Sequence, residues 1–198
     1  MKPEGQQLSL VDDENTAESS PWSGSPIPPE YQVRGLGPVV ITVPELDSTN
    51  RLLTEVLGMR PIRKYPDPAE RRFSTHVYEV AGGGPGAELH VRVRPDLAPY
   101  RPGAGGAHHI AFRVADEETH RAWARRLRDF HIPHSGEIDR YYFRSLYFRE
   151  PNQVLFELAT DGPGFAIDKS LADLGKRLAL PPFLEERRAE IEAKLEEL

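Results

Sequence analysis

The 198-residue chain contains no cysteine. Without thiols it has no disulfide framework, cysteine nucleophile or iron–sulfur cluster, so a bound metal must be held by histidine or carboxylate side chains. The chain also lacks an apolar run of about 18 residues, the length that a membrane-spanning helix needs. Residues 1–15 are polar and contain no apolar signal core. We therefore expect no membrane partner, no secretion and a cytoplasmic location.

Charge of one sign is not concentrated in any part of the chain. The formal net charge is −6, the acidic excess is dispersed, and no basic stripe is present. We therefore expect no nucleic-acid partner. Charged residues make up 28% and hydrophobic residues 38%, which is typical of a globular protein that can bury a core.

Residues 1–33 do not resemble the start of a domain. Residues 3–11 read as a turn followed by a strand, and aligning Pro3 with Pro151 places Ser9 on Glu157. This similarity predicts the closing strand, or stump, of a preceding repeat; a chance similarity over so short a segment is the alternative. The Ser- and Pro-rich stretch up to residue 33 predicts an extended linker.

Two similar units follow, at residues 34–100 and 107–162. The first is predicted as strand 37–43, helix 47–57 and strands 59–64, 72–80 and 88–93, and the second as strand 108–114, helix 116–130 and strands 134–138, 141–148 and 154–160. Both have the order βαβββ, which predicts an α+β fold whose curved mixed sheets pair into one cup. Residues 163–198 are predicted as a loop and then an amphipathic helix from Pro182 to Leu198, which packs on the sheet or, alternatively, forms an oligomer contact.

Two polar side chains stand among apolar residues of the second unit. His109 opens the strand at 108–114, and Glu157 lies inside the apolar strand at 154–160. A buried, unpaired carboxylate costs roughly several kcal/mol, so Glu157 needs a cation, a proton or a route to solvent. A histidine and a glutamate supply two members of the 2-His-1-carboxylate set that favours non-heme Fe(II). The alternatives are an edge histidine without a role and a glutamate that reaches solvent past the sheet edge.

Longer motifs surround this pair: HHIAFR at 108–113, IDRYYFRSLYFRE at 138–150, LFELATDGPGF at 155–165 and LPP at 180–182. Together with the repeated βαβββ unit, they resemble the hydroquinone-type ring-cleaving dioxygenases of the vicinal oxygen chelate superfamily. The resemblance begins near residue 3 and covers only the C-terminal half of that family's polypeptide, the third and fourth of its four units. It implies an Fe(II)-dependent extradiol-type dioxygenase, or the C-terminal half of one, that acts with O2 on a hydroquinone or catechol-like aromatic.

The resemblance also implies roles for individual residues. It makes His109 and Glu157 the metal ligands, with Mn(II) as the alternative to Fe(II). It gives His108 a supporting or acid–base role and places Tyr147 and Arg140 near substrate or O2. The ordinary alternatives are a half-buried strand tyrosine and a surface arginine paired with its neighbouring aspartate. The histidines other than His90, His108 and His109 are expected to be surface or structural residues: His76, His120, His131 and His134.

One expected ligand has no counterpart in this chain. The family's other ligand histidine lies in its first repeat, and the equivalent position of the 34–100 unit is Pro38. His90, which aligns with Glu157, is one alternative source; a homo-oligomer partner or a separate N-terminal half is another. Two other classes of function stay open, a glyoxalase-like lyase or isomerase that uses Ni or Zn and a non-catalytic small-molecule-binding module.

Overall fold

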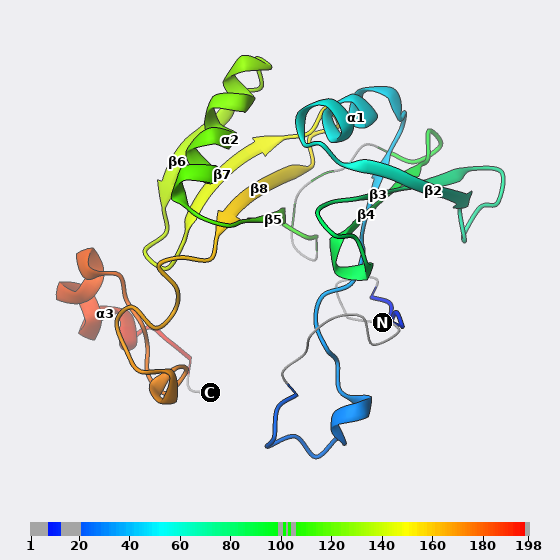
Figure 1. Cartoon of the computed structure of the whole chain (residues 1–198). Coiled ribbons are helices and arrows are strands. Elements are labelled where there is room, and N and C mark those ends of the chain that lie inside the picture. Colours follow the sequence, from blue (N-terminus) through cyan, green and yellow to red (C-terminus); the bar gives the residue numbers. More distant parts are fainter. Residues whose placement is uncertain (1–7, 13–20, 99–100, 102, 104–105, 197–198) are drawn as a thin grey trace.

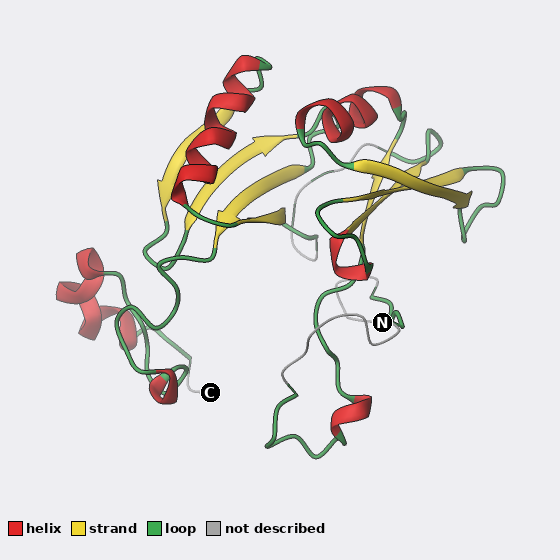
Figure 2. Cartoon of the chain, in the orientation of Figure 1, coloured by secondary structure: helices red, strands yellow, loops and turns green. Residues whose placement is uncertain are grey.

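Two four-stranded mixed sheets and two helical segments make up most of the molecule, shown in Figure 1 as a computed structural model. The structure describes residues 8–12, 21–98, 101, 103 and 106–196. Both helical segments lie along one side of the sheets, while the C-terminal segment lies away from them (Figure 2). The α+β fold expected from the sequence is therefore confirmed.

The first unit forms the sheet β1-β4-β3-β2, in which β1 runs parallel to β4 and the other neighbours are antiparallel. Its elements are β1 (Val39–Val43), α1 (Asp47–Arg51), β2 (Arg60–Pro66), β3 (Ser74–Glu79) and β4 (Glu88–Val93). The predicted helix continues from α1 as a π-helical segment, Leu52–Val56. It ends at Gly58, whose φ of +68° is a left-handed conformation that glycine adopts readily.

The second unit repeats this topology as β5-β8-β7-β6. Its elements are β5 (Ile110–Val114), α2 (Glu117–Asp129), β6 (His134–Asp139), β7 (Arg144–Arg149) and β8 (Leu155–Thr160). Asp116 caps α2 by accepting a hydrogen bond from the backbone N–H of Thr119. β7 starts later than the sequence predicts because Tyr141 has a φ of +70° and residues 140–143 form a turn.

Strand alternation separates a core face from a polar face in each sheet. Leu89 of β4 and Phe156 of β8 are fully buried and belong to one hydrophobic core with Leu53 and Leu127 of the helical segments. The next residue in each strand, His90 or Glu157, consequently points to the opposite face. The two units share a core on the helix side and present polar faces on the other.

Polar contacts also join the two units. Glu150 is fully buried and accepts hydrogen bonds from Thr49 Oγ1 of the first unit (3.0 Å) and from the backbone N–H of Val154 (3.1 Å). Arg126 of α2 donates to the carbonyls of Glu55 and Val56, at 2.7 and 2.6 Å. These carbonyls lie at the end of the first helical segment, where helical partners are missing.

The C-terminal helix is present but much shorter than expected. A 3-10 helix, Pro182–Arg187, precedes the short α3 (Arg188–Glu192). Ion pairs at three-residue spacing, such as Arg188 with Glu185 at 2.7 Å, accompany the tight helix, and Leu195 is 54% exposed. Figure 1 shows α3 away from both sheets, so the predicted packing on a sheet is wrong. Further 3-10 turns are Pro29–Tyr31, Pro85–Ala87 and Leu171–Asp173.

The N-terminal segment does not form its expected strand in the described part. Residues 8–12 have no regular secondary structure and residues 8–11 are exposed. A strand needs neighbouring strands to pair its backbone groups, and this segment has none there. Residues 1–7 of the proposed stump and 13–20 of the linker lie outside the described residues, so the stump stays a prediction. Among the described residues, no helix is long and apolar enough to cross a bilayer.

Candidate metal centre

The structure brings His109 and Glu157 together. His109 directly precedes β5, which pairs in parallel with β8 so that Ala111 lies opposite Glu157. The His109 side chain reaches along the polar face of the sheet, and its Nε2 lies 2.7 Å from Oε2 of Glu157. Two atoms that are able to bind a metal therefore lie close together at the start of β5.

The Glu157 carboxylate is buried and held in one orientation. Its side chain is 3% exposed, whereas that of His109 is 33% exposed. The hydroxyl of Ser145, on the neighbouring strand β7, donates a hydrogen bond to Oε1 of Glu157. One carboxylate oxygen thus faces Ser145 and the other faces His109, which leaves access to the pair from the histidine side.

His108 contacts the far side of the His109 ring. The two Nδ1 atoms are 2.8 Å apart and the rings meet edge to face. One nitrogen must donate and the other accept, because two lone pairs or two N–H groups would repel. A metal ion on Nε2 of His109 requires the lone pair there and places the ring proton on Nδ1, where His108 can accept it. His108 therefore lies where it can fix the tautomer of His109.

Tyr147 and Arg140 complete the group. Tyr147 lies opposite Glu157 in the β7–β8 ladder, and its ring centroid is 5.8 Å from that of His109. Arg140 donates a hydrogen bond to the Tyr147 hydroxyl at 3.3 Å and lies over the tyrosine ring. Asp139 instead accepts a hydrogen bond from the backbone N–H of Tyr141, and the structure does not show the alternative pairing of Arg140 with Asp139.

A second arginine on this face, Arg113, is paired with a carboxylate. Arg113 of β5 donates through Nε to Oδ2 of Asp161 at 2.6 Å. This hydrogen bond holds the pKa of the Asp161 carboxyl below its usual value. Arg113 is therefore committed to an exposed ion pair and does not compete for Glu157.

His90 is not part of this site. It contacts Tyr65 and Glu88 in the other sheet, and no group of three His, Asp or Glu side chains within the described residues could hold a metal ion. His90 therefore does not form a three-ligand group with His109 and Glu157, which are called the metal pair below. The donor set fits two ligands of a facial triad. Ser145 supports one of them, and the sequence analysis missed it because nothing marks this serine until the register of β7 with β8 is known.

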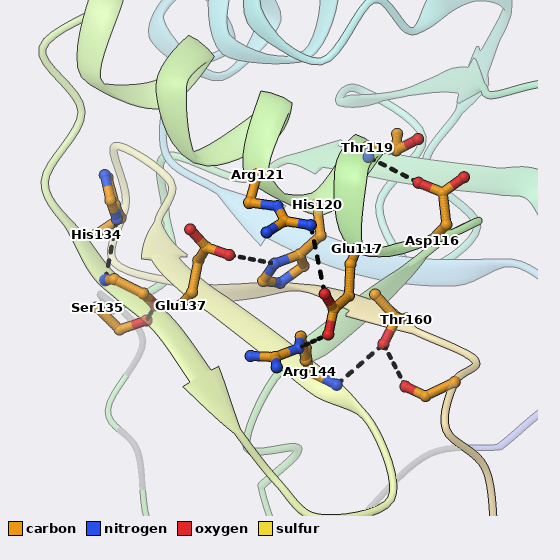
Figure 3. A network of polar contacts seen from close by, with 12 residues as sticks. Asp116, Glu117, Thr119, His120, Arg121, His134, Ser135, Glu137, Arg144 and Thr160 are labelled. Atoms are coloured by element: carbon orange, nitrogen blue, oxygen red, sulfur yellow. Dashed lines mark hydrogen bonds and ion pairs between the residues drawn. The ribbon is translucent and has the colours of Figure 1, made fainter.

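The surroundings of His120 were not predicted from the sequence. His120 of α2 is completely buried, and its Nδ1 lies 3.7 Å from Oε2 of Glu137 (Figure 3). Figure 3 also shows Glu117 of α2 between Arg121, which is on the same helix, and Arg144 of β7. This network lies between α2 and the sheet and does not include the metal pair. His120 is thus a structural residue, as one of the two expectations stated.

Comparison with known proteins places these features in a family. A model described as "Glyoxalase/Bleomycin resistance protein/Dioxygenase superfamily" matches residues 35–158. "Putative ring-cleaving dioxygenase MhqA" of Bacillus subtilis (strain 168) is 48% identical over 97% of this chain and 60% of its own length. The chlorohydroquinone/hydroquinone 1,2-dioxygenase of Sphingobium indicum is 27% identical over 91% of this chain and 55% of its length. The chain thus spans little more than half the length of these relatives.

Solved structures agree with this assignment. A crystal structure described as a "putative dioxygenase from Bacillus subtilis" superposes with a TM-score of 0.80 at 31% identity, over 91% of this chain and 55% of that one. A glyoxylase/bleomycin resistance protein/dioxygenase domain from Frankia, with a TM-score of 0.56 at 20% identity over 67% of this chain and 96% of that one, shares the fold. The resemblance drawn from the motifs is confirmed: the chain belongs to the glyoxalase/bleomycin resistance protein/dioxygenase superfamily.

Proposed function

We propose that this chain forms the metal-binding part of a ring-cleaving dioxygenase that acts with O2 on a hydroquinone or catechol-like aromatic. The observation that carries the proposal is the convergence of His109 Nε2 and Glu157 Oε2 at 2.7 Å. The names of relatives that match nearly the whole chain support the reaction class. Fe(II) is the proposed metal, with Mn(II) as the alternative, because a His and carboxylate set without sulfur suits either ion.

His109 and Glu157 would hold the metal. When bound, the ion supplies open coordination positions that bring an aromatic diol and O2 together and let electron density pass between them. Ser145 holds one oxygen of Glu157 through its hydrogen bond and leaves the other available. His108 orients the His109 ring through the contact between their Nδ1 atoms.

Tyr147 and Arg140 are proposed to act on the substrate. The Tyr147 ring lies next to the His109 ring, and its hydroxyl can donate a hydrogen bond to a substrate oxygen or take a proton from it. The Arg140 guanidinium, which donates to that hydroxyl, can stabilise the negative charge of a phenolate substrate bound nearby. Both residues thus assist loss of the phenolic proton without contributing a metal ligand.

The third ligand is proposed to come from another polypeptide segment, either in a homo-oligomer partner or in a separate N-terminal half. Among the described residues, no group of three His, Asp or Glu side chains could hold a metal ion. Two ligands hold a divalent ion more weakly than three. We therefore expect the 198-residue chain alone to bind Fe(II) weakly and to turn over slowly.

The test is oxygen uptake by the purified chain, loaded anaerobically with Fe(II) and then mixed with hydroquinone and O2. We expect slow uptake that disappears in His109→Gln and Glu157→Gln. Glu118→Gln, an exposed change of the same kind on α2, is the matched control and should keep the wild-type rate.

Uptake that survives both ligand substitutions would contradict the proposed site. Complete absence of uptake, together with no measurable Fe(II) binding, would favour a non-catalytic binding module. Metal binding with isomerisation of a carbonyl substrate and no oxygen uptake would favour the glyoxalase-like alternative. Vigorous turnover by the isolated chain would contradict the proposed need for a third ligand from elsewhere.

A further inference from the structure

The polar face of the first sheet carries a second, ordered group of side chains. Register places Arg63 of β2 opposite Val77 of β3, and Val77 opposite His90 of β4. Tyr65 is likewise opposite Thr75. Val77 is fully buried yet lies outside the core that packs under the helices, because it faces this polar layer instead.

Three of these side chains, Arg63, Tyr65 and His90, form a continuous chain of contacts with Glu88 of β4. The Tyr65 hydroxyl oxygen lies 2.8 Å from Nδ1 of His90, and Nε2 of His90 lies 2.8 Å from Oε2 of Glu88. Arg63 donates two hydrogen bonds to the Glu88 carboxylate, each 2.6 Å long. The side chains of His90 and Glu88 are 11% and 8% exposed, so the group is largely shielded from water.

The direction of these hydrogen bonds follows from the charge on Glu88. Arg63, through its two hydrogen bonds, lowers the pKa of Glu88 against the opposing effect of burial, so this carboxylate is ionised and can only accept. Nε2 of His90 must then be the donor. In a neutral imidazole Nδ1 is consequently the acceptor, and the Tyr65 hydroxyl donates to it. The arrangement is a hydroxyl, an imidazole and a carboxylate in sequence, the order found in catalytic triads.

The surroundings define what this group can bind. Arg63 is neutralised by Glu88, and Arg92 lies 2.6 Å from the buried carboxylate of Asp67, so neither offers a free positive charge. The Tyr65 oxygen keeps lone pairs that can accept a hydrogen bond. Thr75, the cross-strand neighbour of Tyr65, is 1% exposed, and its hydroxyl has no hydrogen-bond partner within the described residues. A buried hydroxyl without a partner is uncommon and marks a place for a ligand polar group.

We propose that Tyr65, His90 and Glu88 form a second site, separate from the metal pair, that binds a neutral phenol and accepts its proton. The phenol O–H donates to the Tyr65 oxygen while the aromatic ring lies against the half-exposed Val40, which is opposite His90 on the neighbouring strand β1. As the phenol proton moves to Tyr65, the Tyr65 proton moves to Nδ1 of His90. The products are a phenolate and an imidazolium that is paired with Glu88. Glu88 and Arg63 are positioning residues, and the step needs no metal and no oxidant.

The test uses 4-nitrophenol, whose phenolate absorbs visible light, and the full chain stripped of metal with a chelator. At a pH below that at which the free probe ionises, adding wild-type protein should raise the phenolate absorbance in a saturable way. Tyr65→Phe removes a single oxygen and should abolish the rise, as should His90→Gln. Glu118→Gln, an exposed change of α2 outside both sites, should leave it unchanged.

No rise with the wild-type chain would overturn the proposal. So would a rise that persists in Tyr65→Phe, or one that Glu118→Gln abolishes equally. Circular dichroism of each variant shows whether a lost signal reflects unfolding; Tyr65→Phe decides the question where His90→Gln does not fold. The proposal is independent of the metal site, so each can fail without the other.

Discussion

Ser145 donates its hydroxyl hydrogen to Oε1 of Glu157, from the strand next to it. This bond keeps Oε2 directed at His109. Ser145→Ala removes the support without touching either ligand, and loss of such an outer partner typically lowers metal affinity about 10-fold or more. Anaerobic Fe(II) titration of the variant should show this loss, and the exposed Ser170→Ala should match wild type. Unchanged affinity would mean that Ser145 does not position the carboxylate.

Tyr147 should affect turnover rather than metal binding. Its ring lies beside the His109 ring, and its hydroxyl accepts a hydrogen bond from Arg140. Tyr147→Phe should keep the Fe(II) affinity but lower the rate of oxygen uptake by about 100-fold, the usual scale for losing a proton-transfer group. Tyr31→Phe, at a tyrosine that is 76% exposed, serves as the control. A variant that loses iron but not rate per bound iron would assign Tyr147 a structural role instead.

The contact between the two units can be tested through Thr49. Its hydroxyl donates to the fully buried carboxylate of Glu150. Thr49→Val keeps the shape and removes the donor, so the free energy of unfolding should fall by about 1–3 kcal/mol. Urea denaturation measures this change. The hydroxyl of Thr54 donates only to a backbone carbonyl within its own helix, so Thr54→Val should lower the free energy of unfolding by less. Equal decreases in the two variants would show that the Thr49–Glu150 hydrogen bond does not stabilise the contact between the units.

Stability should depend on pH through Glu88. Its pKa is lowered in the folded protein, chiefly because Arg63 donates two hydrogen bonds to the carboxylate. The stabilisation is therefore complete above the unfolded-state pKa, about 4.3, and is lost as the pH falls through the lower folded-state pKa. Urea unfolding from about pH 6 down to about pH 3 should show a smaller acid loss in Arg63→Met than in wild type. An identical loss would place the pH dependence elsewhere.

Strand alternation and the repeated unit made most of the fold predictable. The sequence alignment of His90 with Glu157 agrees with the structure, in which each follows a core residue, Leu89 or Phe156, and lies on the opposite face of its strand. The pairing of β5 with β8 then brings His109 to Glu157. The two residues are 48 positions apart in the sequence. The strand order of the repeated unit is enough to bring them together.

Features that depend on tertiary surroundings were not predictable. A periodic apolar stripe predicted one long C-terminal helix, but no sheet surface lies beside it and the chain forms only α3 and 3-10 turns. The partners of His90 come from β2 and β4, and no motif marks Tyr65 as its neighbour. Hydroxyl supports such as Ser145 carry no spacing signal of their own; they appear only when the strand register is known.

The central claim, that His109 and Glu157 hold a metal ion, is tested most directly by anomalous diffraction at the iron edge from crystals of the chain grown anaerobically with Fe(II). The account predicts an iron peak within bonding distance of His109 Nε2 and Glu157 Oε2, with these two atoms moved apart from their present 2.7 Å. An iron peak at another group of side chains, or no peak at this pair at saturating Fe(II), would contradict it.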